Sequence, residues 1–236
     1  MANITIKDRI FSFEIIRRQR KSVEIQIDSV NGFRVIAPKR LAEKAIMHLL
    51  EPRKEWIYEK MLEIEQAQAF RVVKNYADGE IFLILGIEYP LEIQIEPNRK
   101  RSVAVVENEK IIVRAPESSR DLIRTAVLTF YKKLAREEIE RRIEPILKSL
   151  GVTCTRIAIK DQKRRWGSCS HLGNLNFNWR CVMMPEPVFE YIIAHEVCHL
   201  VHLNHSKAYW DLLETVCPYD KQAKLWLKQM GMLLDI

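Results

Sequence analysis

The sequence predicts an α+β fold in which two similar hairpin-plus-helix units precede a C-terminal domain of strands and helices. Two observations support this prediction. A pattern of β-branched alternation, a turn, the dipeptide Ala-Pro and a helical stretch occurs twice in the first 150 residues. Strand-like segments then lead into an apolar helix that contains a cluster of histidines. Alternation with a period of two is typical of strands, and apolar spacing of three to four residues is typical of helices.

The first copy of the pattern lies in residues 1–70, the predicted first unit. Its expected elements are strands at 20–27 and 33–38 and helical spacing over 41–68. The turn between the strands is predicted at Asn31-Gly32. Pro38 ends the second strand because proline cannot donate a hydrogen bond to a sheet, and Pro52 is expected at a junction between helices.

The second copy lies in residues 71–150, the predicted second unit. Its expected elements are strands at 101–106 and 111–116 and a helical stretch from Ser118, with a long amphipathic helix over 121–150. Two further strands, at 81–85 and 89–95, are expected between the two copies. Gly151 stands where a helix usually stops. A copy of about 40 residues is too small to bury a core alone, so we expect the copies to pack with each other or with the remaining chain.

The third predicted domain comprises residues 151–236. We expect strands at 155–160 and 174–183, which should form an antiparallel pair, and a helix that opens after Pro185. An exposed strand edge beside that helix could align an extended peptide by main-chain hydrogen bonds.

Composition narrows the class of protein. The chain has 236 residues, of which 47% are hydrophobic and 29% charged, and these values exclude collagen-like, low-complexity and disordered chains. Its longest apolar runs fall far short of the roughly 18 residues that cross a bilayer. Lys7, Asp8 and Arg9 interrupt the N-terminal segment before a secretory signal could form. The sequence therefore predicts a cytoplasmic protein without a membrane partner.

Charge and cysteine content set further limits. Five cysteines without a CxxC pair argue against a disulfide framework and against a four-thiolate zinc site. The net charge is +7, and the basic excess lies in residues 1–60, which have 13 basic and 8 acidic side chains. Such an excess can favour nucleic acid, although interspersed charges of both signs are typical of an ordinary protein surface.

Five of the six histidines lie within a stretch of 35 residues. His195 and His199 enclose Glu196 in the pattern H-E-x-x-H, on the expected helix. Residues four apart project from one helix face about one turn apart, so both imidazoles can reach one ion. Glu196 is then placed to hold a metal-bound water and to take its proton without being a ligand.

A catalytic zinc needs a third protein ligand and keeps its fourth position for water. His205 follows His195 by ten residues, and Asn204 could end the helix in a left-handed conformation and turn His205 back toward the ion. Glu214 is the alternative third ligand. The spacing equals that of metzincins, but His202 stands where that pattern requires glycine.

Four segments of the chain resemble the YgjP-like metallopeptidase family. They are QKRRWGSCS at 162–170, GNLNFNWR at 173–180, YIIAHEVCHL at 191–200, and NHS at 204–206 with the Tyr-Trp pair at 209–210. The N-terminal hairpin with Ala-Pro, the strand region 78–86 and the long helix also resemble that family's fuller-length members. The similarity therefore spans nearly the whole chain, and WGSCS is its most distinctive piece.

The resemblance implies a zincin-type catalytic domain, related in style to SprT-like proteases, with antiparallel strands beside the H-E-x-x-H helix. It implies a zinc ion on His195, His199 and His205, with Glu196 as catalytic base. A peptide or protein would be the substrate.

Candidate substrate-binding residues lie near the motif. They are Lys163, Arg164, Arg165, Trp166 and Tyr209. The basic triplet could hold a phosphate or carboxylate while the indole of Trp166 stacks on a base or side chain; alternatively, Trp166 packs on the core. Tyr209 and His202 are candidates for a second hydrogen-bond donor to the oxyanion.

Three functions remain open from the sequence. The leading hypothesis is a zinc-dependent metallopeptidase that hydrolyses peptide bonds by Glu-assisted attack of a metal-bound water. The first alternative is a metal-dependent hydrolase of nucleoside triphosphates, which would be held by the basic triplet. The second is a non-catalytic zinc module that binds nucleic acid through residues 1–60, although structural zinc sites more often use thiolates.

Overall fold

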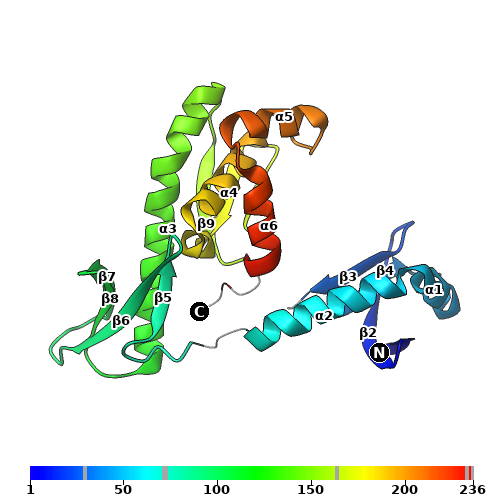
Figure 1. Cartoon of the computed structure of the whole chain (residues 1–236), viewed down its shortest axis with the longest axis horizontal. Coiled ribbons are helices and arrows are strands. Elements are labelled where there is room, and N and C mark those ends of the chain that lie inside the picture. The colour runs from blue at the N-terminus through cyan, green and yellow to red at the C-terminus, as the bar shows by residue number, and fades with distance from the viewer. Residues whose placement is uncertain (29–30, 71–73, 163–164, 232–233, 235–236) are drawn as a thin grey trace. The chain divides into compact units, whose positions relative to one another are not determined.

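The computed structural model describes residues 1–28, 31–70, 74–162, 165–231 and 234, with the backbone alone for 67–70. The chain divides into two compact units, Met1–Val72 and Val73–Ile236 (Figure 1). Helices and small mixed sheets occur in both units, which confirms the predicted α+β class. No helix in the described ranges is long and apolar enough to cross a membrane.

The first unit is a four-stranded sheet packed against helices. Its elements are β1 (Ala2–Ile6), β2 (Arg9–Arg18), β3 (Glu24–Asp28), β4 (Gly32–Pro38), α1 (Glu43–Leu50), the 3-10 turn η1 (Glu51–Arg53) and α2 (Lys54–Phe70). The strand order is β1-β2-β4-β3, with β2 and β4 parallel and both outer pairs antiparallel. Alternate strand residues such as Phe13 and Val35 pack with Ile46 and Leu50 of α1 in one core.

The second unit begins with a sheet of the same strand order. Its elements are β5 (Ile81–Ile84), β6 (Ile87–Ile95), β7 (Val103–Glu107), β8 (Lys110–Ala115) and α3 (Arg120–Leu150). The order is β5-β6-β8-β7, and again the central pair is parallel and the outer pairs antiparallel. The helix ends as expected at Gly151, which has a φ of 64°.

A three-stranded sheet and four helical segments complete the second unit. They are β9 (Arg156–Lys160), β10 (Gly167–Cys169), β11 (Asn174–Asn178), η2 (Trp179–Met183), α4 (Glu186–Cys198), α5 (Lys207–Val216) and α6 (Asp220–Met230). The predicted antiparallel pairing of 155–160 with 174–183 is wrong, because β9 and β11 run parallel. The short strand β10 reverses the chain between them, and it is β10 that pairs antiparallel with β11.

Helix α3 holds the parts of the second unit together. Its buried residues recur at intervals of about one turn and include Val127, Tyr131, Ala135 and Ile139. This apolar stripe packs against β8, η2 and α4, so the sheet and the C-terminal helices share one core. In Figure 1, α3 accordingly extends from the second sheet to the C-terminal helices. The predicted boundary at 150/151 is thus crossed by a continuous core, and the three-domain division stays a prediction.

The turn between β5 and β6 contacts the start of α4. Leu85 and Gly86 form a two-residue turn, and the amide of Leu85 donates to the carbonyl of Val182 over 2.7 Å. Gly86 has a φ of 79°, and a Cβ placed on it would lie 2.9 Å from Cα of Pro185. Only glycine meets both conditions, so the turn can support the chain where α4 begins.

We predict that Gly86→Ala destabilises the protein more than Gly79→Ala does. Both glycines have a φ of 79°, but a Cβ on Gly79 would meet no atom within 4 Å. Gly79→Ala should therefore cost about 1–2 kcal/mol of unfolding free energy for the left-handed backbone alone. Gly86→Ala should cost about 1–3 kcal/mol more, because the methyl group is forced against Pro185. Urea unfolding of both variants measures the difference; equal costs would contradict the contact.

Candidate metal centre

The C-terminal end of α4 positions the H-E-x-x-H residues. His195 and Glu196 lie in its last turn, and His199 is the residue that follows Cys198, the last residue of the helix. The helix closes with tightened turns, in which the amides of Leu200 and Val201 donate three residues back. The prediction that Asn204 ends the helix in a left-handed conformation is wrong, because the helix stops earlier and Asn204 has no positive φ.

Three imidazoles converge beyond this helix end. The ligand nitrogens that His195, His199 and His205 offer all lie within 4.8 Å of one another. Nε2 of His205 is 3.3 Å from Nε2 of His195. The loop after α4 therefore returns His205 to the other two histidines, as the sequence predicted. Glu214, the alternative third ligand, is exposed on α5 and is not part of this group.

In His195 and His199, hydrogen bonds at Nδ1 leave the opposite ring nitrogen, Nε2, available to a metal ion. The hydroxyl of Tyr209 lies 3.1 Å from the carbonyl oxygen of His195, to which it donates, and 2.7 Å from Nδ1 of His195, from which it can then accept. Nδ1 of His199 donates to the carbonyl of His202 over 3.0 Å. These contacts fix the ring tautomers that present Nε2 to a metal ion.

The protonation of these rings also suits a metal. Burial, reinforced by the nearby His199 and His205, lowers the pKa of His195 to about 3. Burial and the neighbouring His199 likewise lower the pKa of His205. Both rings are therefore neutral near pH 7, and a neutral imidazole is the form that binds a metal.

Glu196 follows His195 on α4 and is buried. The residue is 5% exposed, and its Oε2 accepts no hydrogen bond from the described residues. Burial raises its pKa to about 8, against a smaller lowering effect of Arg165. An unpartnered buried carboxylate is costly and calls for a functional explanation. A cation with its water in the adjacent space would satisfy it, so the donor set and this carboxylate together fit a catalytic metal site.

Strand β10 approaches Glu196 closely at a glycine. A Cβ on Gly167 would lie 2.5 Å from both Cγ and Oε1 of Glu196, and the backbone of Gly167 is not left-handed. Space, and not backbone conformation, is therefore what requires glycine here. The spacing of residues in the WGSCS motif gives no indication of this contact, because Gly167 and Glu196 are far apart in sequence.

The other predicted site residues occupy different surroundings. Lys163 and Arg164 lie outside the described residues. Arg165 is exposed, while Trp166 is partly buried and packs on the core next to Gly231. Tyr209 is fully buried, so its hydroxyl faces His195 and not solvent.

One neighbour of the site escaped the sequence analysis. The ring of Trp210 stacks on His205, with centroids 5.2 Å apart and planes 20° from parallel. Lys224 of α6 covers the same indole, 3.8 Å from its centroid. Nothing in the spacing of Trp210 relative to the motif predicts this stacking, because it depends on the path of the loop between α4 and α5.

This combination of a buried H-E-x-x-H helix end, a third histidine and an unpartnered glutamate is typical of metallopeptidases. Residues 21–230 match the family described as YgjP-like, metallopeptidase domain. The match covers most of the chain, which therefore belongs to the YgjP-like family. The resemblance noted from the sequence motifs is confirmed.

Two solved structures are similar to part of this chain. One is the metallopeptidase zymogen of Pyrococcus abyssi abylysin, 23% identical, with 40% of this chain and 94% of that chain covered and a TM-score of 0.35. The other is the metallopeptidase zymogen of Methanocaldococcus jannaschii jannalysin, 26% identical, with 37% and 93% covered and a TM-score of 0.33. No curated protein matches the sequence. The family membership thus rests on the family match itself.

We predict that Tyr209→Phe weakens metal binding while Tyr191→Phe does not. Loss of the Tyr209 hydroxyl removes the 2.7 Å contact that orients His195, whereas the Tyr191 hydroxyl lies 3.4 Å from the same nitrogen. Removing a partner that orients a ligand typically costs about 10–100-fold in metal affinity. Zinc dissociation constants measured by competition with a chromogenic chelator test this. Equal affinities of Tyr209→Phe and the wild type would rule out the orienting role.

Proposed function

We propose that this chain is a zinc-dependent metallopeptidase whose catalytic base is Glu196. The observation that supports the proposal is the convergence of three imidazoles together with the buried carboxylate of Glu196, which follows the first of them and whose Oε2 has no partner among the described residues. Three imidazoles with one open position favour zinc among the common divalent metals. When bound, zinc would supply Lewis-acid polarisation of the scissile carbonyl and would lower the pKa of the attacking water.

Each residue of the site would have a distinct role in peptide hydrolysis. His195, His199 and His205 hold the metal, and Tyr209 orients His195 through its hydroxyl. Glu196 accepts the proton of the attacking water and delivers it to the leaving amine. The direct contact of Tyr209 with substrate that the sequence suggested stays a prediction, as does a role of His202 at the oxyanion.

Strand β10 offers a place for an extended peptide. It pairs with β11 on one side, and within the described ranges no strand pairs with its other side. An extended chain that adds to this edge forms main-chain hydrogen bonds, which is a common mode of peptide recognition. Because Gly167 of β10 touches Glu196, a peptide bound along this edge would lie next to the proposed base.

The alternatives and the finer organisation also stay predictions. No contact of the described residues favours hydrolysis of nucleoside triphosphates by the basic triplet, and the buried Glu196 would have no task in a non-catalytic zinc module. The repeated strand order of the two four-stranded sheets supports a duplication of units 1–70 and 71–150. A zincin-like domain over residues 151–236 stays a prediction. The cytoplasmic location remains an expectation from the sequence.

We predict that Glu196→Gln abolishes peptide hydrolysis and retains the metal. The amide is nearly the same size as the carboxylate but cannot accept a proton, so turnover should fall by roughly 10²–10⁴-fold. Zinc content, measured by elemental analysis after dialysis, should stay at the level of the wild type because Glu196 is not a ligand. A variant that still cleaves a denatured protein at the wild-type rate would reject Glu196 as the base.

We also predict that Gly167→Ala slows turnover by displacing Glu196. The added methyl group cannot coexist with Oε1 of Glu196 at 2.5 Å, and the flexible carboxylate end is the part that must move. A displacement of about 1 Å at a reacting group can cost about 100-fold in rate. The expected result is a lower kcat with unchanged zinc affinity.

The double variant Gly167→Ala/Glu196→Asp distinguishes displacement from general damage. Aspartate is shorter by one methylene and leaves room for the added methyl group. The two substitutions should therefore be less harmful together than the product of their separate effects on kcat. Fully multiplicative losses would show that Gly167 and Glu196 act independently.

A further inference from the structure

Positive charge is concentrated at one edge of the first sheet. The carboxyl ends of the parallel strands β2 and β4 meet there, with Arg18 opposite Pro38, and the loop from β2 to β3 and the turn after β4 lie at the same edge. We call the segments 17–24 and 38–42 the basic edge. Its basic residues are Arg17, Arg18, Arg20, Lys21, Lys39 and Arg40, and its acidic residue is Glu24.

Two of these arginines fix the backbone of the basic edge. The guanidinium of Arg17 donates to the carbonyls of Pro38 and Leu41 and so joins β2 to the turn after β4. Arg20 donates to the carboxylate of Glu24 over 2.7 Å. The two segments are therefore held in a defined arrangement by side chains of the edge itself.

The remaining four cations are free to bind a ligand. Arg18, Lys21, Lys39 and Arg40 are exposed. Among the described contacts, none is an ion pair or a side-chain hydrogen bond of these four residues. An unpaired cation on a pre-arranged backbone can contact an anion without breaking an existing interaction.

The net positive charge of the first unit comes from the basic edge. Residues 1–72 have 14 basic and 10 acidic side chains, a net charge of +4. The basic edge alone contributes +5, so the rest of the unit has a net charge of −1. This distribution differs from the interspersed charges of an ordinary protein surface, and it creates a local positive field.

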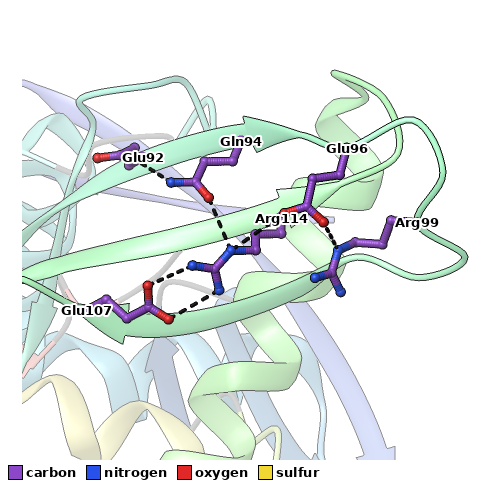
Figure 2. Close-up of polar contacts among 6 residues, drawn as sticks. All are labelled: Glu92, Gln94, Glu96, Arg99, Glu107 and Arg114. Carbon is purple, nitrogen blue, oxygen red and sulfur yellow. Dashed lines mark hydrogen bonds and ion pairs between the residues drawn. The ribbon is translucent and has the colours of Figure 1, made fainter.

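The second sheet provides a comparison for the basic edge. It has the same strand order, yet Arg99, in the corresponding loop after β6, pairs with Glu96 over 2.8 Å. Arg114 on β8 pairs with Glu107 over 2.7 Å and also bonds Gln94 (Figure 2). Lys100 and Arg101 of the same loop are exposed and make no ion pair among the described contacts, so this loop leaves two cations unpaired where the basic edge leaves four. The larger unpaired charge of the first sheet points to an anionic ligand there.

We propose that the basic edge binds the sugar-phosphate backbone of a double-stranded nucleic acid, without preference for base sequence. Arginine and lysine are the residues that contact phosphates. Segments 17–24 and 38–42 contain no aromatic residue that could stack on unpaired bases. None of the exposed large apolar side chains of the first unit lies in them either, which disfavours insertion into a lipid surface.

The test is binding of the full-length protein to a fluorescent 20-base-pair DNA duplex of arbitrary sequence, measured by anisotropy. Four phosphate contacts predict that affinity falls roughly 100-fold between 50 and 200 mM salt. A variant with R18Q, K21Q, K39Q and R40Q should lose at least about tenfold in affinity at 50 mM salt. A parallel measurement with an RNA duplex shows whether the protein prefers DNA or RNA, since both present a sugar-phosphate backbone.

A matched variant controls for net charge. K100Q, R101Q, K132Q and K148Q remove four exposed positive charges from the second unit, and binding should stay within about twofold of the wild type. Thermal melts show whether both variants fold. If the variant with four substitutions at the basic edge does not fold, R18Q with K21Q alone should give an intermediate loss of DNA affinity. Equal losses in the two variants, salt-independent binding, no binding of either duplex, or tighter binding to phosphatidylserine vesicles would overturn the proposal.

Discussion

The central constraint in this protein is the burial of Glu196 without a hydrogen-bond donor to its Oε2 among the described residues. Burial favours the neutral form of this carboxyl group, and it also favours the neutral forms of His195 and His205. The positive charge of Arg165 opposes the effect of burial on Glu196 but is the smaller of the two effects. A divalent metal held by the three imidazoles would add positive charge and would satisfy the facing nitrogens of His195 and His205.

The surrounding structure maintains this arrangement at several levels. Gly167 brings a strand against Glu196, Tyr209 and the carbonyl of His202 orient two of the rings, and Trp210 stacks on the third. Farther away, the turn at Gly86 contacts the residue before α4. The second sheet of the YgjP-like chain thus supports the start of the helix that contains His195 and Glu196.

The sequence predicted the elements whose signal is local. Alternation and helical spacing predicted the second sheet and α3, and the spacing of the histidines predicted the convergence of His195, His199 and His205. The strands β1 and β2 were not predicted, although apolar residues alternate around Phe11 and Phe13, because charged residues interrupt the apolar pattern at 7–9 and 17–18. The parallel pairing of β9 with β11 depends on three residues of β10, which are too few for a periodic signal.

The contacts of single side chains were the least predictable part. Tyr209 was considered for the oxyanion because of its distance along the chain, whereas its burial against His195 depends on how α5 packs on α4. The close approach at Gly167 likewise depends on two elements that are far apart in sequence. Neither propensity nor spacing contains information on such tertiary contacts.

The place where α4 stops has an electrostatic consequence. Peptide dipoles along a helix add up to a partial negative charge of roughly half an electron at its carboxyl end. Helix α4 ends at Cys198, directly before His199, so the negative end of its dipole lies where the chain presents His195 and His199. The main chain itself therefore attracts a cation to this point and repels anions, which would help the site to discriminate between them before any side chain makes contact.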